Sequence, residues 1–303
     1  MTIVWVDREC SDDERRQALF RGELFLYSPT RASTELVEFT REYLSEAFGG
    51  RDPRTAQFEL PVEEYAAILA EAKPRYIHHE RHKALLRELL QELGCDPAKT
   101  YFDVPRLRTS TSNDYLTTGI AYAFHPHRDT WYSAPMCQIN WWMPVFELSP
   151  ENPMAFHPQY WDRPVPNSSQ IYDYQEWNKR SRFAAATQIG KDDRPQPRPV
   201  EPVDVAHDVR LLPKPGGIIV FSAAQLHSSV PNTSSETRIS IDFRTVHAED
   251  VEALSGAPNV DSNCTGSTMA DYLRVEDLSR LPERLAAPYA DGPPQRSRLA
   301  RRA

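Results

Sequence analysis

In one segment in the last third of the chain, apolar and polar residues alternate so strictly that the pattern limits what the chain can fold into. In "RISIDFRTV", residues 238–246, apolar side chains occupy every second position from Ile239 to Phe243. The positions between them hold Arg238, Ser240, Asp242 and Arg244. Because successive side chains of a strand point to opposite faces, the segment predicts a β-strand with one apolar and one polar face. A polar face of this kind needs partners when it is buried, so we expect it to line a polar cavity.

The pattern of residue types along the sequence changes near residue 100. Before it, apolar residues recur at helical spacing in "TELVEFTREYLSEAF", "PVEEYAAILAEA" and "ERHKALLRELLQELG". After it, short runs rich in aromatic and β-branched residues alternate with Pro and Gly, which is typical of antiparallel strands. The predicted strands lie near residues 101–111, 119–129, 136–146, 152–159, 209–214, 217–224 and 238–246. These features favour a β core preceded by a layer of helices.

The length of 303 residues fits a single large domain. We expect this domain over residues 1–290, with a helical N-terminal layer (1–99), a β core (100–250) and a C-terminal extension (251–290). The arginine-bearing residues 291–303 predict a disordered tail. Residues 161–202 are polar, aromatic and proline-bearing, and a connection of this length is typical of a binding loop or lid.

Composition excludes several classes of partner. The net charge is -8, with 35 Lys+Arg against 43 Asp+Glu, so no overall positive field attracts nucleic acid. The four cysteines lie far apart without a CxxC pair, which favours a reducing compartment over a disulfide framework. No apolar run approaches membrane-spanning length, and the N-terminus lacks the apolar core of a signal peptide. We therefore expect a cytoplasmic protein that binds a small molecule and neither nucleic acid nor a membrane.

A second segment, "FHPHRDTWYS" at residues 124–133, places His127 and Asp129 two positions apart. On a strand both side chains, and that of His125, would leave the same face. Imidazole and carboxylate groups are ligands for divalent first-row metals, although such a pair also fits a hydrogen-bonded surface turn. Farther along, His227 follows the predicted strand at 217–224, and Arg238 opens the alternating strand. Four elements in this order favour the metal site over the surface turn.

This order resembles the Fe(II)/2-oxoglutarate-dependent oxygenases, whose motif is His-x-Asp, a distant His and then an Arg, often within Arg-x-Ser. The helical preface and "YFDVPRLR" look most like the phytanoyl-CoA-dioxygenase-like branch. One departure is "ENPMAFHPQYWDRPVPNSS", where relatives of that branch usually carry a Gly-rich segment. The resemblance covers residues 101–246. It implies a mainly β fold with α, namely a double-stranded β-helix (jelly roll, cupin-like) with an N-terminal helical layer.

The resemblance also implies roles for individual residues. His127, Asp129 and His227 would hold Fe(II), while Arg238 and Ser240 would bind the far carboxylate of the co-substrate 2-oxoglutarate. With O2, the co-substrate would become succinate and CO2 as a substrate C–H bond is oxidised. An aspartate at position 129 implies oxygenation or desaturation, because the related halogenases have a small residue there. The expected enzyme is a dioxygenase that hydroxylates, desaturates, cyclises or demethylates a small polar substrate, such as an amino acid derivative or a natural-product intermediate.

Further residues are candidates for contacts in the cavity. Gln138 and Asn140 share the polar face of the predicted strand at 136–146, where they would either touch 2-oxoglutarate or make core hydrogen bonds. Candidate substrate contacts are Trp131, Tyr132, His125, Arg244 and Trp161. Four of them also have a structural interpretation: core packing for Trp131 and Tyr132, a plain strand histidine for His125, and an ion pair with Asp242 for Arg244. Trp161 belongs to the polar, aromatic segment at 161–202.

Other functions remain open from the sequence. A cupin-like metalloenzyme that does not use 2-oxoglutarate would keep the metal ligands and have no need of Arg238. A non-catalytic metal-binding or sensing protein would bind iron without consuming the co-substrate. An oxygenase acting on a protein side chain would keep the same chemistry with a different target.

Overall fold

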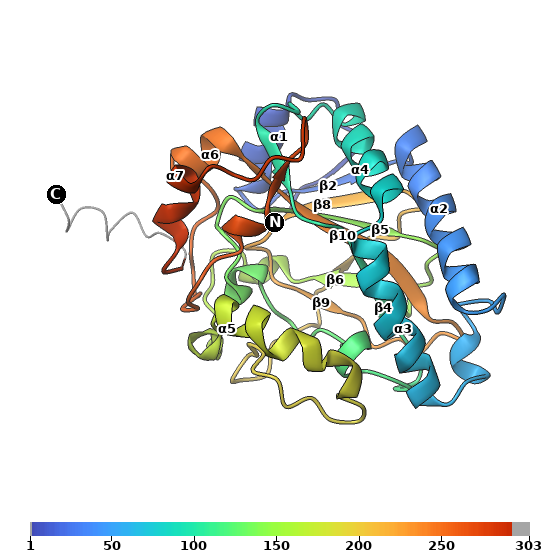
Figure 1. Cartoon of the computed structure of the whole chain (residues 1–303). Coiled ribbons are helices and arrows are strands. Elements are labelled where there is room, and N and C mark those ends of the chain that lie inside the picture. Colours follow the sequence, from blue (N-terminus) through green and yellow to red (C-terminus); the bar gives the residue numbers. More distant parts are fainter. Residues whose placement is uncertain (1, 293–303) are drawn as a thin grey trace.

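Two facing β-sheets form the centre of the computed structural model, which describes residues 2–292 (Figure 1). The larger sheet has the order β1-β2-β8-β5-β10-β3-β11, with β4 also paired to β10. β1 and β2 pair in parallel and the other pairings are antiparallel. Its strands are β1 (Val4–Val6), β2 (Leu24–Tyr27), β3 (Thr100–Phe102), β4 (Arg106–Ser110), β5 (Ile139–Pro144), β8 (Ile218–Ser222), β10 (Arg238–His247) and β11 (Leu273–Arg274). The smaller sheet has the order β7 (Val209–Arg210), β6 (Met154–Phe156) and β9 (His227–Ser229).

Helices cover the outer face of the larger sheet. They are α1 (Asp12–Leu19), α2 (Arg31–Ala47), α3 (Val62–Ile77) and α4 (Glu80–Glu92), and the last three lie along one side of the sheet in Figure 1. Ser11 and Thr30 begin α1 and α2 with capping boxes, which satisfy backbone N–H groups that have no partner inside the helix. The apolar face of β10 packs into this layer, and Phe243 stacks on Trp141 with ring centroids 5.7 Å apart. Burial of each such side chain stabilises the fold by roughly 1.5–3 kcal/mol.

The inner face of the larger sheet faces the smaller sheet. Trp142 and Phe221 from the larger sheet pack with Met154 and Phe156 from the smaller one, and the rings of Phe156 and Phe221 are 5.0 Å apart. The polar face of β10 points to the same side, because Asp242 lies opposite Trp142 in the antiparallel pairing. The alternation in the sequence therefore correctly predicts one apolar and one polar face.

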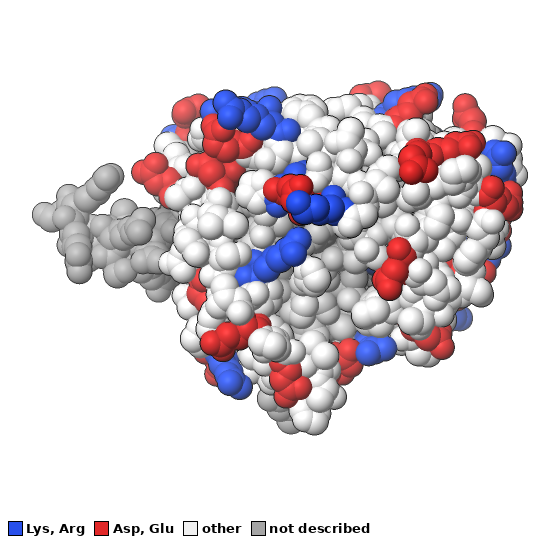
Figure 2. All heavy atoms as spheres, turned by 90° about the horizontal axis from the view of Figure 1, so that it is seen from below, with Lys and Arg blue, Asp and Glu red and all other residues white. Residues whose placement is uncertain are grey.

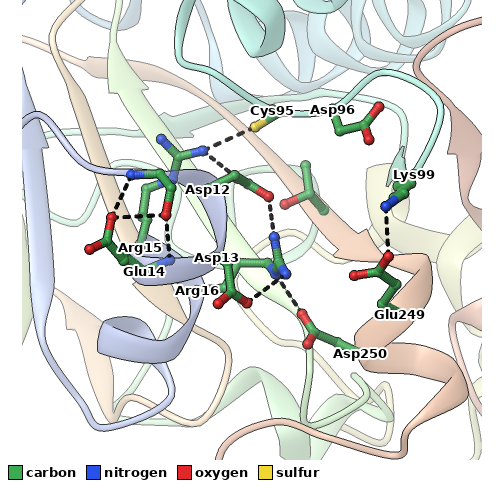
Figure 3. Close-up of polar contacts among 12 residues, drawn as sticks. Asp12, Asp13, Glu14, Arg15, Arg16, Cys95, Asp96, Lys99, Glu249 and Asp250 are labelled. Carbon is green, nitrogen blue, oxygen red and sulfur yellow. Dashed lines mark hydrogen bonds and ion pairs between the residues drawn. The ribbon is translucent and has the colours of Figure 1, made fainter.

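The larger sheet includes strands from both ends of the described chain, which the sequence did not predict. β2 pairs with β8 and β11 pairs with β3, so the N-terminal layer is not entirely helical. Figure 3 shows how α1 is joined to α6 (Ala248–Glu252): Arg16 binds Asp12 and also Asp250, with Nε 2.7 Å from Oδ2. The short helix α7 (Glu283–Ala286) follows β11. Residues 293–303 of the predicted tail lie outside the described residues.

The predicted strand at 119–129 is wrong, and the predicted strand at 101–111 is interrupted. Residues 119–121 form a 3-10 turn, His127 makes a single β-bridge to His227, and Asp129 begins a second 3-10 turn that ends at Tyr132. Pro126 has no N–H with which to extend a ladder, and Ser133 adopts a left-handed conformation with φ of 65°. Between β3 and β4, Pro105 likewise breaks the pairing.

The predicted long segment at 161–202 is ordered around short helices. It holds α5 (Tyr174–Lys179) and a 3-10 helix at Ser181–Thr187, and we call residues 161–202 the insertion. The Thr118 hydroxyl donates to the carbonyl of Gln188 at 2.7 Å, and the N–H of Gly119 donates to Asp192 at 3.0 Å. The insertion is therefore anchored to the loop that precedes His127.

Two findings concern the chain as a whole. Within residues 2–292, no helix is both long and apolar enough to cross a membrane. All four cysteines are free thiols, and three of them are buried.

Candidate metal centre

Three predicted ligands converge between the two sheets. The ligand atoms of His127, Asp129 and His227 all lie within 4.8 Å of one another. Asp129 Oδ1 is 3.4 Å from His127 Nε2 and 3.8 Å from His227 Nε2, and the two imidazole rings are 4.3 Å apart. Both histidines are buried, whereas Asp129 is partly exposed. Two imidazole nitrogens and one carboxylate oxygen on one side of a point match a three-ligand site for a divalent first-row metal.

The backbone fixes the two histidines relative to each other and sets their tautomers. Each donates its backbone N–H to the other's carbonyl at 2.9 Å, which forms the single β-bridge between His127 and the first residue of β9. Nδ1 of His127 lies 2.8 Å from the carbonyl oxygen of His125, and Nδ1 of His227 lies 2.9 Å from that of Gln225. A carbonyl only accepts, so each Nδ1 carries the proton and each Nε2 keeps its lone pair for a metal.

Two amide side chains hold the carboxylate of Asp129. Asn140 lies in β5, and Gln138 immediately precedes that strand. Its second oxygen, Oδ2, accepts from Asn140 at 2.9 Å and from Gln138 at 3.3 Å. Gln138 in turn accepts from the hydroxyl of Tyr272 at 2.8 Å. Oδ1 therefore remains directed at the histidines. Of the two predicted roles for Gln138 and Asn140, the structure places both residues in a buried hydrogen-bond network around the carboxylate.

The charges at this site suit a cation. Burial acts to raise the pKa of Asp129. The hydrogen bond to His127, the charge that His227 carries in acid and the charge of Arg244 outweigh this effect and hold the pKa well below its usual range. Burial, with a smaller effect of His127, lowers the pKa of His227 to about 4. At neutral pH the site thus holds an ionised carboxylate and a neutral His227, which is the protonation state that metal ligands require.

Arg238 is a buried guanidinium with almost no partner. It is 7% exposed, and its one hydrogen bond within residues 2–292 is a long contact of 3.4 Å to the Ser240 hydroxyl. Its Nε has no acceptor among the described residues, and its guanidinium lies 5.5 Å from the centre of the Trp142 ring. Burial lowers the pKa of Arg238 to about 10, so it is still charged at neutral pH. A buried charge without a counterion is costly, so this cation fits an anionic ligand bound at the inner face.

The candidate substrate residues separate into two groups. Tyr132 lies edge-on to His127 with ring centroids 5.4 Å apart, and so stands beside the candidate centre. Trp131 is completely buried and its indole N–H donates to Asp261 at 2.7 Å, so core packing accounts for it. Trp161 packs on the backbone of Gly22. The side chain of His125 is exposed, and its backbone carbonyl orients His127.

The predicted ion pair between Arg244 and Asp242 does not form. Arg244 binds Asp103 with an N–O distance of 3.1 Å, and Asp242 binds Arg108 at 2.7 Å. Residues two apart on a strand lie farther from each other than from side chains on the neighbouring strands. Arg244 nevertheless stays near the candidate centre, because it lies opposite Asn140 in β5.

Arg128 and Asp261, which the sequence analysis did not single out, hold the backbone between His127 and Asp129 in place. Arg128 is 1% exposed, and its Nε donates to Asp261 at 3.1 Å. Its other N–H groups donate to backbone carbonyls, including that of Ala224. The position of Arg128 between two ligands was a visible signal in the sequence, whereas nothing in the sequence pointed to Asp261.

Comparison with known proteins gives remote structural similarity. No family model matches the chain, and no curated protein matches it. Several solved structures do resemble it. "EvdO2 from Micromonospora carbonacea var. aurantiaca complexed with 2-oxoglutarate" shares 16% identity with a TM-score of 0.45, covering 80% of this chain and 94% of that one. The "non-heme alpha ketoglutarate dependent epimerase SnoN from nogalamycin biosynthesis" shares 13% identity with a TM-score of 0.38, covering 78% and 84%.

A third structure is "non-heme monooxygenase; ThoJ apo", at 14% identity and a TM-score of 0.39 over 87% of this chain and 84% of that one. These neighbours are described as non-haem or 2-oxoglutarate-bound proteins. Because the scores are low, we base the function of this chain on its own side chains.

Proposed function

We propose that the protein is an Fe(II)- and 2-oxoglutarate-dependent oxygenase that oxidises a C–H bond of a small polar molecule. His127, Asp129 and His227 would hold the iron, and Arg238 with Ser240 would bind the far carboxylate of 2-oxoglutarate. When bound, iron, 2-oxoglutarate and O2 supply the oxidation, with 2-oxoglutarate converted to succinate and CO2. The substrate class, an amino acid derivative or a natural-product intermediate, is part of the same proposal.

The observation that carries this proposal is the buried, unpaired guanidinium of Arg238 on the strand beside the three ligands. A metal-binding protein alone has no need of it, since an unpaired buried cation only destabilises the fold. A dicarboxylate co-substrate accounts for it, because a guanidinium binds a carboxylate through two parallel hydrogen bonds. The orphaned Nε and the long contact to Ser240 leave donors free for such a ligand.

The architecture of the proposed enzyme follows from the two sheets. We take β4, β10, β5 and β8 as one sheet of a double-stranded β-helix. The bridge at His127 with β9, β6 and β7 would be the other. His127 and His227 then lie side by side in the smaller sheet, facing the polar side of β10. A single domain over residues 1–290 is part of the proposal, with the terminal segments adding strands to the edges of the larger sheet.

The chain's own residues would orient the reactants and exclude water. Asn140 and Gln138 hold one oxygen of Asp129 away from the metal, so the carboxylate binds through the other. Tyr132 and the insertion close the side of the centre next to His127. Holding a substrate carbon in a fixed position near a reactive centre is a large part of what such an enzyme contributes.

Anaerobic titration with Fe(II) and 2-oxoglutarate tests the proposal. The iron–2-oxoglutarate chelate absorbs weakly in the visible range, and we expect that band in the natural protein. Asp129→Ala should abolish the band, and Arg238→Ala should weaken 2-oxoglutarate binding by about 10-fold or more. Arg284→Ala, which removes an exposed arginine, serves as the control and should leave both unchanged.

Two outcomes would favour the alternatives. Iron binding without the band, or full affinity for 2-oxoglutarate in Arg238→Ala, would indicate a cupin-like metalloenzyme that does not use this co-substrate. A normal band without any succinate formation in air, over a broad set of small polar compounds, would favour a sensing protein.

A further inference from the structure

A second group of charged side chains lies on the inner face of the larger sheet, beside the candidate metal centre. Arg106 and Arg108 project from β4, and Asp242 and Arg244 project from β10. Arg106 lies opposite Asp242 in the pairing of these strands. Asp103 sits in the gap between β3 and β4, where its N–H donates to the carbonyl of Arg244 at 3.0 Å.

These five side chains do not balance in charge. Arg108 and Asp242 pair with each other, with Nε 2.7 Å from Oδ1. Asp103 forms ion pairs with two arginines. Its Oδ2 lies 2.6 Å from Nη1 of Arg106 and 3.1 Å from Nη1 of Arg244. Three guanidinium groups thus meet two carboxylates, which leaves one positive charge in excess.

The excess charge faces the accessible side of the group. The Asp103 side chain is 3% exposed, whereas Arg106 and Arg244 are 23% and 15% exposed. A guanidinium carries five N–H donors, so each arginine retains donors beyond those that Asp103 accepts. The carboxylate of Asp103 is thus more deeply buried than the guanidinium groups of Arg106 and Arg244. A ligand that approaches the group would meet the positive charges first.

This pair of arginines shares its surroundings with the metal centre. Arg244 lies opposite Asn140, which donates to Asp129. Burial raises the pKa of the Tyr172 hydroxyl in the insertion, while the charges of Arg244 and Arg106 act in the opposite direction. The ring of Tyr172 is 5.2 Å from that of Tyr132, which in turn is 5.4 Å from His127. The pair, the two tyrosines and the ligands therefore border the same region.

The positive charge of this pair is not part of a broad basic surface. Figure 2 shows the molecule from below, on the side of α5, and there blue and red side chains are interspersed without a broad basic patch. Two further acids lie near the pair. Asp129 and Arg244 shift each other's pKa, but Asp129 is one of the three candidate metal ligands. Asp271 is exposed and accepts from the hydroxyl of Tyr174. A confined positive site of this kind suits a small anion rather than a polyanion.

We propose that Arg106 and Arg244 bind an acidic group of the organic substrate, a carboxylate or a phosphate, beside the aromatic rings of Tyr132 and Tyr172. The proposal names the substrate class of the proposed oxygenase and rests on that function. The anion site itself is made by the protein chain and does not require iron.

The pair offers a substitution that spares the fold. Arg106→Gln leaves Asp103 paired with Arg244, and Arg244→Gln leaves it paired with Arg106, so either change removes the excess charge without leaving a buried carboxylate unpaired. Asp103→Asn changes the balance the other way and adds one positive charge. Arg284→Gln removes an exposed arginine and is the matched control.

Calorimetric titration with phenylacetate, phenyl phosphate and the neutral phenylacetamide tests the site. Each probe is added to metal-free protein, and also to protein saturated with Fe(II) and 2-oxoglutarate so that Arg238 is occupied. We expect the two anions to bind and the amide to bind at least about 10-fold more weakly. Arg106→Gln and Arg244→Gln should weaken anion binding about 10-fold or more, Asp103→Asn should strengthen it, and Arg284→Gln should change nothing.

Equal binding of acid and amide, no binding of any probe, or unchanged anion affinity in both arginine variants would overturn the proposal. The visible band of the iron chelate is recorded in the same samples. An intact band with no selectivity for anions means that only the substrate inference fails. Selective anion binding without a band means that the anion site stands while the oxygenase function fails.

Discussion

Arg128 and Asp261 form a buried ion pair across 133 residues of chain, with Nε 3.1 Å from Oδ2. The pair is 1% and 5% exposed, and Arg128 stands between two of the three candidate metal ligands. Asp261 also accepts from the indole N–H of Trp131 and from the N–H of Val165. The position of His127 and Asp129 thus depends on a carboxylate in the C-terminal segment.

Replacing Asp261 should therefore damage both stability and metal binding. Asp261→Asn leaves the Arg128 guanidinium buried without a counterion, and breaking a buried pair in this way costs about 3–5 kcal/mol. Urea unfolding of the metal-free protein measures this loss. The exposed pair of Arg284 and Glu252 is the control, since Glu252→Gln should cost about 1 kcal/mol or less. A small loss in Asp261→Asn would show that the backbone carbonyls alone hold Arg128.

Asn140 should matter for metal affinity more than for folding. Asn140→Ala removes the 2.9 Å hydrogen bond to Oδ2 of Asp129, so the carboxylate is free to rotate away from the histidines. Loss of such a supporting contact weakens metal binding by about 10–100-fold. Titration with Fe(II) under anaerobic conditions gives the affinity, and Asn263→Ala, at an exposed position, is the comparison. Equal affinities in the two variants would contradict the orienting role of Asn140.

Stability should fall as the pH drops, in part through His82. This histidine is fully buried against Tyr76, and burial lowers its pKa from 6.5 to about 4. Between these values the unfolded chain binds a proton that the folded protein does not, so stability is lost as pH falls through this window, by up to about 3 kcal/mol.

His82→Leu should remove this contribution and flatten the pH dependence of the free energy of unfolding. The measurement is urea unfolding of metal-free protein at several pH values between 4.5 and 6.5. His78→Leu, at an exposed position on the preceding turn, should leave the slope as it is. An unchanged slope in His82→Leu would mean that other buried groups, such as His157, dominate the acid response.

Gly119 should control how firmly the insertion is docked. It has a φ of 59°, and an added Cβ would lie 2.2 Å from the carbonyl oxygen of Ala185 and 2.6 Å from that of Gln188. Gly119→Ala should push the insertion outward and speed its proteolysis near residues 180–190. Gly50→Ala is a close control, because Gly50 has a φ of 82° but no heavy atom of the described part of the chain within 4 Å of an added Cβ. Both variants carry similar backbone strain, so a difference between them reports the contact.

The spacing of chemical groups along the sequence predicted the centre better than the local structure around it. His127, Asp129 and His227 come together as the motif implied, yet the argument from a shared strand face was wrong for Asp129. Its carboxylate reaches the histidines from the first residue of a 3-10 turn. Pro126 and the left-handed Ser133 set that geometry, and the hydroxyl of Ser133 donates to the carbonyl of Thr265, which is far away in the sequence.

The alternation of polar and apolar residues in β10 reliably indicated a strand, because any strand of a sheet with one apolar face has an apolar residue at every second position. The partners of its polar residues were not predictable. Asp242 pairs with Arg108 and Arg244 with Asp103, both supplied by a neighbouring strand or loop far away in the sequence. The packing of Trp161 on Gly22 was not predictable for the same reason, since only the fold brings the two together.

The pair of Arg128 and Asp261 also has a consequence for how the protein is made. During synthesis all three candidate ligands leave the ribosome well before Asp261 does. Until Asp261 arrives, the guanidinium between His127 and Asp129 has no counterion to draw it into the interior, and the ligand loop lacks its final anchor. A nascent or truncated chain that ends before Asp261 should bind iron poorly despite containing every ligand. Metal loading would then be delayed until Asp261 has been synthesised.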